Sequence, residues 1–313
     1  MRFNPKARLD RSQVQNRRGS GAGGGSGMGF PVGGGRGGMK VGGGIGGVIV
    51  LVIIVLLQSG ILGGGSGGLG PQSGGGPVST GGGELAHCRT GADANSDPDC
   101  ARLGIVNSIQ SFWSQALPDQ SNQQYAQSDT VIFSDQVSTE CGAATSQVGP
   151  FYCPVDKLVY LDTTFFEDML ERQLGGSSED FAEAYVLAHE YGHHVQDLLG
   201  TMGRVRTQQG ADSDAVRLEL QADCYAGMWS RFATEAEDAD GQVFIVELTQ
   251  DDIDEALSAA RAVGDDRIQQ RTSGRVDPDA WTHGSAEQRM RWFMTGRDKG
   301  TLQACDTFAA GPL

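Results

Sequence analysis

Residues 186–193 have the sequence Val186-Leu187-Ala188-His189-Glu190-Tyr191-Gly192-His193, and they carry the clearest structural signal in the chain. His189 and His193 are four residues apart, so a helix would place both imidazoles on one face, within reach of one metal ion. Glu190 follows His189 directly and could reach a water molecule held by that metal. The apolar residues before the motif favour a helix in the core, and we predict one over residues 177–200.

A second motif supplies candidates for the rest of a metal site. A catalytic zinc ion takes three protein ligands and keeps one position open. Glu219 and Asp223 are also four residues apart, in a helix predicted over residues 213–233. Glu219 would complete a His-His-Glu ligand set, and Asp223 would accept a hydrogen bond from the far nitrogen of a ligand histidine. Both acids could instead be ordinary solvated helix residues, but Leu218 and Leu220 on either side favour the ligand role for Glu219.

His283 is a further candidate, within Trp281-Thr-His-Gly-Ser-Ala-Glu-Gln-Arg289 and just before a helix predicted to begin at Ser285. It could donate a hydrogen bond to the oxyanion that forms beside a catalytic zinc ion. A purely structural role at the start of the helix is an equally open interpretation. Of the other histidines, His194 would point about a quarter-turn away from the metal ligands, and His87 is expected to be exposed.

The rest of the chain after residue 84 is predicted to be rich in helix with a small sheet. Helical periodicity and capping residues indicate further helices over residues 103–117, 162–174 and 249–263. Strand-like composition predicts short strands at residues 130–133 and 157–161. We therefore expect an α+β, helix-rich, zincin-like domain over residues 85–313.

The first 84 residues differ in composition from the rest, because they hold most of the 48 glycines. Residues 1–62 contain eight Lys or Arg and a single acid, Asp10. Residues 41–62 are uncharged and long enough for a transmembrane helix, which needs about 20 residues. The composition thus predicts three segments: a basic, Gly-rich, disordered cytoplasmic tail over 1–40, a transmembrane anchor over 41–62, and a Gly/Ser-rich flexible linker over 63–84.

The flanking charges set the expected orientation. Basic residues precede the anchor, and positively charged flanks stay inside, so residues 85–313 are expected outside the cytoplasm in a single-pass cell-membrane protein. A cleaved signal peptide is the alternative that the sequence leaves open.

The six cysteines all follow the predicted anchor, which agrees with disulfides in an exported domain. Six cysteines allow 15 pairings. Proximity in the sequence favours Cys88–Cys100 and Cys141–Cys153, which leaves Cys224–Cys305. A cysteine metal site is the alternative, but the sequence contains no C-x-x-C spacing.

The charge balance limits the partners. The chain has 39 Asp and Glu against 24 Lys and Arg, a net charge of -15. Such an acidic domain would be repelled by phosphate backbones, so we expect no nucleic acid as a partner. The peptide or protein substrate that we expect follows instead from the metal-site motifs described above.

The motifs together resemble the bacterial "putative neutral zinc metallopeptidase" family. The resemblance extends over almost the whole chain and is carried by four blocks: Gly149-Pro-Phe-Tyr-Cys-Pro154, Ala188-His-Glu-Tyr-Gly-His-His-Val-Gln196, Glu219-Leu-Gln-Ala-Asp-Cys-Tyr-Ala-Gly227 and Thr282-His-Gly-Ser-Ala-Glu-Gln-Arg289. It implies zinc and peptidase activity. Glu219 is also similar to the acid that binds zinc in the wider gluzincin pattern.

The predicted function is therefore that of a membrane-anchored zinc peptidase acting outside the cytoplasm. His189, His193 and Glu219 would hold Zn²⁺, and Glu190 would act as the general base. His283 or a nearby tyrosine could assist at the oxyanion, and a strand such as 155–161 could pair with an extended substrate unless it is internal. Two alternatives stay open: a non-enzymatic zinc-binding protein of the cell envelope, and a zinc amidase acting on cell-wall peptides.

Overall fold

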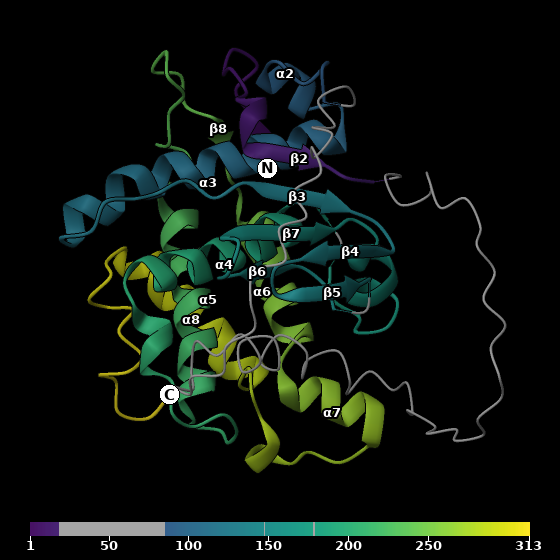
Figure 1. Cartoon of the computed structure of the whole chain (residues 1–313), viewed down its shortest axis with the longest axis vertical. Coiled ribbons are helices and arrows are strands. Elements are labelled where there is room, and N and C mark those ends of the chain that lie inside the picture. The colour runs from purple at the N-terminus through teal and green to yellow at the C-terminus, as the bar shows by residue number, and fades with distance from the viewer. Residues whose placement is uncertain (19–84, 147, 178) are drawn as a thin grey trace, which may run out of the picture.

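The computed structural model describes residues 1–18, 85–146, 148–177 and 179–313 (Figure 1). Its strands are β1 (Arg2–Phe3), β2 (Val14–Asn16), β3 (Thr130–Phe133), β4 (Gln136–Thr139), β5 (Gly142–Thr145), β6 (Phe151–Cys153), β7 (Leu158–Asp162) and β8 (Ile245–Glu247). Its α-helices are α2 (Gly91–Ala94), α3 (Pro98–Gln120), α4 (Asp180–Leu198), α5 (Asp214–Phe232), α6 (Gln250–Ala262), α7 (Asp265–Ser273) and α8 (Ala286–Lys299). Short turns of other helix types are η1 (Arg11–Gln13), the π-helix η3 (Phe166–Glu171), η4 (Thr201–Arg204) and η5 (Pro278–Ala280).

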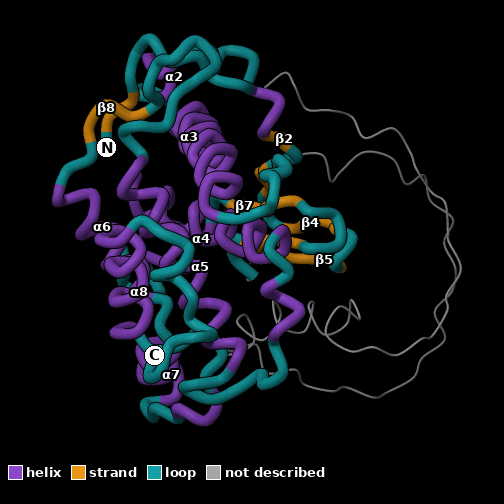
Figure 2. The backbone as a smooth tube through the Cα atoms, turned by 90° about the vertical axis from the view of Figure 1, so that its left-hand side faces the viewer, coloured by secondary structure: helices purple, strands orange, loops and turns teal. Residues whose placement is uncertain are grey.

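A four-stranded sheet has the order β2-β3-β7-β6. β2, β3 and β7 are parallel, and β6 is antiparallel to β7 at one edge. All four residues of β3 are buried, as expected for an inner parallel strand covered on both faces. β3 and β7 confirm the strands predicted at 130–133 and 157–161. Figures 1 and 2 both show the β4–β5 hairpin on the same side of the molecule as β7.

The helical layer is organised around α4, which contacts α3, α5 and α6. Gly192 allows α4 to approach α5 closely, because a Cβ at this position would lie 3.0 Å from the Cα of Ala222. α5 and α8 are closer still, since a Cβ on Gly227 would lie 1.9 Å from the carbonyl oxygen of Phe293. The helix-rich α+β prediction with a small sheet is thus confirmed, and α4 and α5 are brought together along the motifs that they carry.

Residues 1–18 belong to this fold rather than to a disordered tail. β1 pairs antiparallel with β8, and β2 pairs parallel with β3 in the register Val14↔Thr130. Phe3 is buried against the main core, and the amine of Met1 forms an ion pair with Asp252. The remainder of the predicted tail, residues 19–40, and the predicted linker, residues 63–84, lie outside the described residues.

The membrane prediction has to be corrected. Across the described ranges, no helix combines the length and apolar character that crossing a membrane requires. The predicted anchor at 41–62 lies outside the described residues. A single-pass arrangement would put residues 1–18 and 85–313 on opposite sides of a membrane, whereas the structure pairs them in the same sheets. The predicted single-pass cell-membrane protein, with residues 1–18 and 85–313 on opposite sides, is therefore wrong.

All three predicted disulfides are present. Cys88–Cys100, Cys141–Cys153 and Cys224–Cys305 have Cα–Cα distances of 5.1, 5.9 and 5.6 Å. The first two each close a short loop, and the third ties the C-terminal segment to α5.

Two local differences affect the site. The helix predicted over 162–174 is replaced by a turn followed by the π-helix η3. α7 was not predicted at all, because it is polar and only Asp265 and Ile268 of its residues are buried. Both elements border the site described below.

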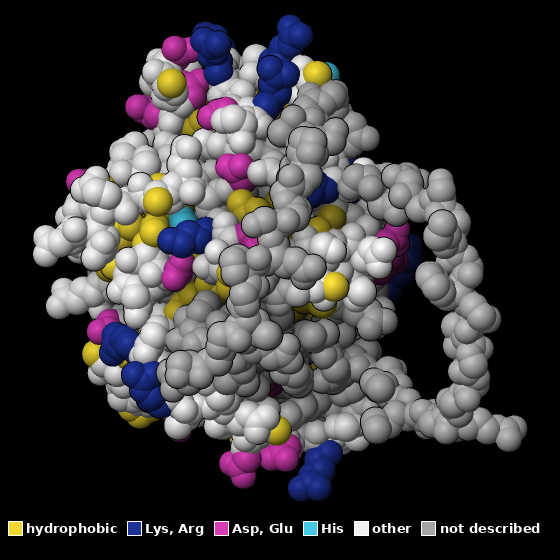
Figure 3. Space-filling model, in the orientation of Figure 1, with side chains coloured by type: hydrophobic (Ala, Val, Ile, Leu, Met, Phe, Trp, Pro, Cys, Tyr) yellow, Lys and Arg dark blue, Asp and Glu magenta, His cyan; other side chains and the backbone are white. Residues whose placement is uncertain are grey.

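On the face shown in Figure 3, Asp and Glu side chains lie among Lys and Arg side chains. The exclusion of nucleic acid as a partner therefore still rests on the net charge of -15. It stays a prediction.

Candidate metal centre and active site

Two neighbouring helices present the predicted metal ligands to one another. α4 carries His189 and His193, and α5 carries Glu219. All three side chains are buried, and their ligand atoms lie within 4.8 Å of one another. The Nε2 atom of His189 is 3.3 Å from Oε2 of Glu219, and Nε2 of His193 is 3.5 Å from Oε1. The structure thus brings together the three residues that the sequence proposed as a ligand set.

The spacing of these atoms fits a zinc ion. Zinc binds imidazole nitrogen and carboxylate oxygen at about 2.0–2.2 Å in tetrahedral geometry, so two ligands of one ion lie about 3.3–3.6 Å apart. The two measured nitrogen–oxygen distances fall within that range. Two neutral nitrogens and one carboxylate also leave a fourth position for water or substrate, as in catalytic zinc sites.

The electrostatics of the cluster favour positive charge. Burial lowers the pKa of His189, but the charge of Asp223 and hydrogen bonds to Asp223 and Glu219 raise it to about 10. Burial raises the pKa of Glu219, yet the charges of His283 and His193 hold it well below its usual range. A buried carboxylate that stays ionised between imidazoles is a suitable environment for a bound cation.

Asp223 contacts the nitrogen of His189 that faces away from Glu219. Its carboxylate accepts hydrogen bonds from Nδ1 of His189 at 2.8 Å, from the hydroxyl of Tyr185 at 2.6 Å, and from Nε and Nη2 of Arg289 at 2.9 and 3.0 Å. The carboxylate is an acceptor only, so Nδ1 of His189 carries a proton, and Nε2, which faces Glu219, is the nitrogen that could bind a metal. This is the geometry proposed for Asp223 from the sequence.

Glu190 lies in the same cavity as the ligands and is itself buried. Burial raises its pKa, while the charges of His189 and His193 act in the opposite direction. A buried carboxylate with a raised pKa beside a metal site is suited to accepting and returning a proton.

His283 also reaches the cluster. Its Nε2 atom is 4.0 Å from Oε2 of Glu219, and its Nδ1 atom is 2.7 Å from Oγ1 of Thr282. The Oδ2 atom of Asp265 accepts the backbone N–H groups of Thr282, His283 and Gly284 and so fixes this loop. The position is compatible with the oxyanion role, which stays a proposal.

Comparison with known proteins agrees with this geometry. A family model described as "Putative neutral zinc metallopeptidase" matches residues 1–308. The chain belongs to this family. The match begins at residue 1, in agreement with the place of residues 1–18 in the fold.

This family member is similar to proteins of Mycobacterium and Escherichia. It is 51% identical over 232 residues to "Uncharacterized protein Rv2575" of Mycobacterium tuberculosis, which covers 74% of this chain and 77% of the relative. The "Uncharacterized protein Mb2605" of Mycobacterium bovis has the same identity and coverage. It is 42% identical over 210 residues to "Uncharacterized protein YpfJ" of Escherichia coli K12, covering 65% of this chain and 69% of the relative. No solved structure matches the chain.

A cavity of about 120 Å³ adjoins the predicted ligands of this family member. One part of its wall is formed by His189, Glu190, His193, Glu219 and His283, and another by the apolar side chains of Phe165, Met169, Leu174, Val186, Val263 and Ile268. The segment at residues 148–150, which leads into the edge strand β6, also lines it. β7 lies between β3 and β6, so the internal alternative holds for the strand at 155–161, and β6 is the edge strand on this side of the sheet.

The sequence did not identify every residue that shapes the site. Tyr185 and Arg289, which bind Asp223, were not singled out, although Arg289 closes the Thr282–Arg289 block. Asp265 was missed because α7 was missed. The contact between Arg289 of α8 and Asp223 of α5 can be recognised only when the packing of the two helices is known.

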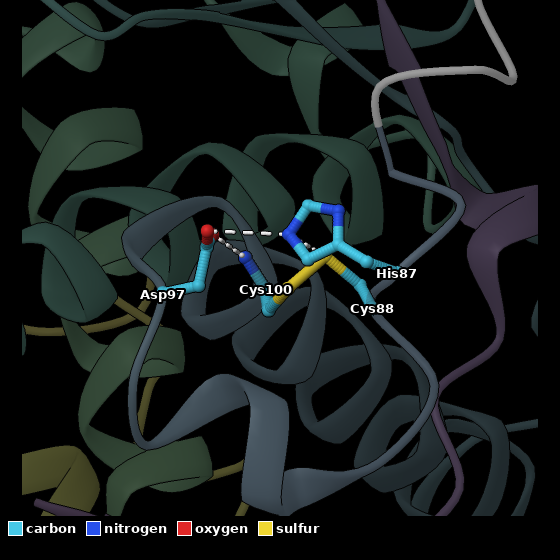
Figure 4. A group of neighbouring side chains, drawn as sticks. All are labelled: His87, Cys88, Asp97 and Cys100. Atoms are coloured by element: carbon cyan, nitrogen blue, oxygen red, sulfur yellow. Dashed lines mark hydrogen bonds and ion pairs between the residues drawn. A yellow bond between two sulfur atoms is a disulfide. The ribbon is translucent and has the colours of Figure 1, made fainter.

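A second group of metal-binding residue types, His87, Cys88, Asp97 and Cys100, lies in the described chain. Figure 4 shows that the two sulfurs are joined in a disulfide and that His87 faces Asp97, at 3.2 Å between Nε2 and Oδ2. Disulfide sulfurs are not thiolates and do not bind zinc. This group is therefore a structural disulfide at the start of α3, with a contact between His87 and Asp97 beside it.

Proposed function

We propose that this protein is a zinc-dependent peptidase in which Glu190 acts as the general base on an attacking water molecule. The observation that supports it best is the convergence of His189, His193 and Glu219 from two helices, with the buried carboxylate of Glu190 in the same cavity. A site that only stored zinc would need the three ligands but not the carboxylate of Glu190.

Each residue has a defined task in this proposal. Bound zinc would lower the pKa of its water toward about 7 and polarise the scissile carbonyl. Glu190 takes the proton from the attacking water and returns it to the leaving amine. Asp223 holds His189 in the orientation that turns Nε2 to the ligand site. His283 approaches from α8's N-terminal side and can donate a hydrogen bond to the oxyanion.

The apolar wall of the cavity indicates the kind of peptide that fits. Phe165, Met169 and Ile268 offer an apolar surface beside Glu190. A large apolar side chain next to the scissile bond would remove this surface from water, at about 25 cal/mol per Å² buried. The backbone of such a substrate could extend along the edge strand β6. We therefore expect preferential cleavage beside Leu, Ile, Met or Phe.

The test compares Glu190→Gln with Glu219→Gln in the full-length protein. Glu190→Gln should lower hydrolysis of a mixed peptide library by about 10²–10⁴-fold, the usual contribution of a general base. Its zinc content should stay at the wild-type level, whereas Glu219→Gln should lose both zinc and activity. Wild-type hydrolysis rates in the Glu190→Gln protein would contradict the mechanism.

Casein and peptidoglycan as parallel substrates separate the remaining options. Cleavage of peptidoglycan alone would indicate an amidase acting on cell-wall peptides. Stoichiometric zinc with no hydrolysis of either substrate would indicate a zinc-binding protein without catalysis.

A further inference from the structure

A line of buried side-chain amides connects His193 to the C-terminal segment. The Nδ1 atom of His193 lies 2.8 Å from Oε1 of Gln196. Nε2 of Gln196 donates to Oε1 of Gln221 at 3.1 Å, and Nε2 of Gln221 donates to the carbonyl oxygen of Cys305 at 3.0 Å. Both glutamines are buried, so these contacts replace hydrogen bonds to water.

The carbonyl oxygen of Cys305 determines which amide atom donates and which accepts in each of these hydrogen bonds. A carbonyl oxygen only accepts, so the Cys305 carbonyl requires the NH₂ group of Gln221 to face it, which turns Oε1 toward Gln196. Gln196 also donates to the carbonyl oxygen of Leu218, at 2.7 Å, so its NH₂ group is fixed in the same sense. Oε1 of Gln196 must then face His193. Nδ1 of His193 must therefore carry a proton, and Nε2, which faces Glu219, is the nitrogen that could bind a metal.

The hydrogen-bonded amides of Gln196 and Gln221 also link the two helices that carry the predicted ligands. Leu218 directly precedes Glu219, so Gln196 joins α4 to the backbone of α5 beside the third ligand. Cys305 is held to α5 by its disulfide with Cys224, and Thr307 donates to the carbonyl of Arg217 at 2.6 Å. The C-terminal segment is thereby fastened along α5 and presents the carbonyl at which the chain ends.

We propose that Gln196 and Gln221 are positioning residues that hold His193 in the tautomer and orientation that present Nε2 to zinc, with the Cys305 carbonyl as their anchor. The inference rests on the proposed function for the identity of the metal. The two glutamines position His193, whereas Asp223 positions His189. Neither glutamine touches substrate or the reacting atoms.

Zinc affinity measured by competition with a chromogenic chelator tests the proposal. Gln196→Leu should weaken zinc binding by about 10–100-fold, the usual effect of removing a hydrogen-bond partner of a ligand histidine. Gln221→Met, which does not touch His193, should weaken it in the same direction but less. Gln196→Glu keeps an acceptor for Nδ1–H and should recover most of the affinity that Gln196→Leu loses, although a buried carboxylate makes it less stable than wild type.

A spectroscopic readout separates positioning from general destabilisation. The Nδ1–H proton of His193 should give a slowly exchanging NMR signal in wild type and lose it in Gln196→Leu, with or without zinc. Gln110→Met is the matched control, because Gln110 is a buried glutamine in another amide cluster, where it donates to Gln13 at 3.0 Å. It should lower the unfolding midpoint without changing zinc affinity or the His193 signal.

Two results would overturn the proposal. One is zinc affinity in Gln196→Leu within twofold of wild type at temperatures where the variant is folded. The other is an equal loss of affinity in Gln110→Met and Gln221→Met. If wild type itself binds no zinc, the proposed function fails, and the His193 proton signal still decides whether the amide chain positions the imidazole.

Discussion

Asp223→Asn should be among the most damaging single substitutions in the protein, even without metal. The Asp223 carboxylate has no exposed surface and accepts from four donors on His189, Tyr185 and Arg289. Burial raises its pKa, but the charges of Arg289 and His189 hold that pKa at about 2. An asparagine is uncharged, and its NH₂ group would have to face some of these donors.

The magnitude follows from the charge left behind. Arg289 is itself buried, so Asp223→Asn leaves a guanidinium without a counter-ion, which costs about 3–5 kcal/mol. With a urea m-value of about 3 kcal/mol per M, the unfolding midpoint should fall by roughly 1–2 M. The measurement is urea unfolding of chelator-treated protein with its disulfides intact, followed by circular dichroism.

Two further variants make this prediction specific. Asp162→Asn is the matched control, because Asp162 is also fully buried, and its carboxylate accepts hydrogen bonds from the N–H and hydroxyl groups of Thr164 rather than from a charged side chain. It should change the midpoint little. Combining Asp223→Asn with Arg289→Met removes the unpaired charge and should restore part of the lost stability. A loss below about 1 kcal/mol for Asp223→Asn, or a double variant as unstable as the sum of the singles, would refute the reasoning.

Three other outcomes are expected. Chelation should lower the thermal midpoint of wild type, since free zinc at 100 times its Kd stabilises the folded state by about 2.7 kcal/mol. Gly227→Ala should destabilise by about 3 kcal/mol because its Cβ would meet the Phe293 carbonyl at 1.9 Å, whereas Gly203→Ala has open space and should be neutral in the same urea titration. Replacing Cys224 and Cys305 together by Ser should cost about 4–5 kcal/mol for the 81-residue separation, measured by the same unfolding curve under non-reducing conditions.

The candidate metal site was predictable because its information is local. His189 and His193 define one helix face, and Glu219 and Asp223 define another, so two short motifs specify four side chains. What remained was whether the two faces meet. That depends on the close approach at Gly192, which no periodicity reveals.

The N-terminal residues were mispredicted because their structure depends on distant partners. β1 and β2 contain only two and three residues, too few for an alternating pattern to be recognised. Val14 pairs with Thr130, far along the chain. The basic side chains between the strands resemble a solvated tail when considered alone. The membrane prediction failed with them, since it assumed that residues 1–18 and 85–313 are apart.

α7 escaped detection for a related reason. Ile268 is the single large apolar residue among its nine residues, so no apolar stripe marks it as a helix, yet Asp265 at its start holds the loop of His283. The apolar cavity was likewise not predictable, because Phe165, Val186 and Ile268 come from three separate elements.

The pairing of residues 14–16 with β3 determines what would happen if the backbone were cleaved after residue 18. All three disulfides lie after residue 87, so no disulfide would join residues 1–18 to the rest once the backbone was cut. A cut between residues 19 and 84 would leave two fragments that stay associated. A fragment lacking residues 1–18 would expose the edge of β3, whose Thr130–Phe133 residues are otherwise buried. Bare apolar edges recruit strands from other molecules, so that fragment should aggregate until a peptide of residues 1–18 is supplied in trans.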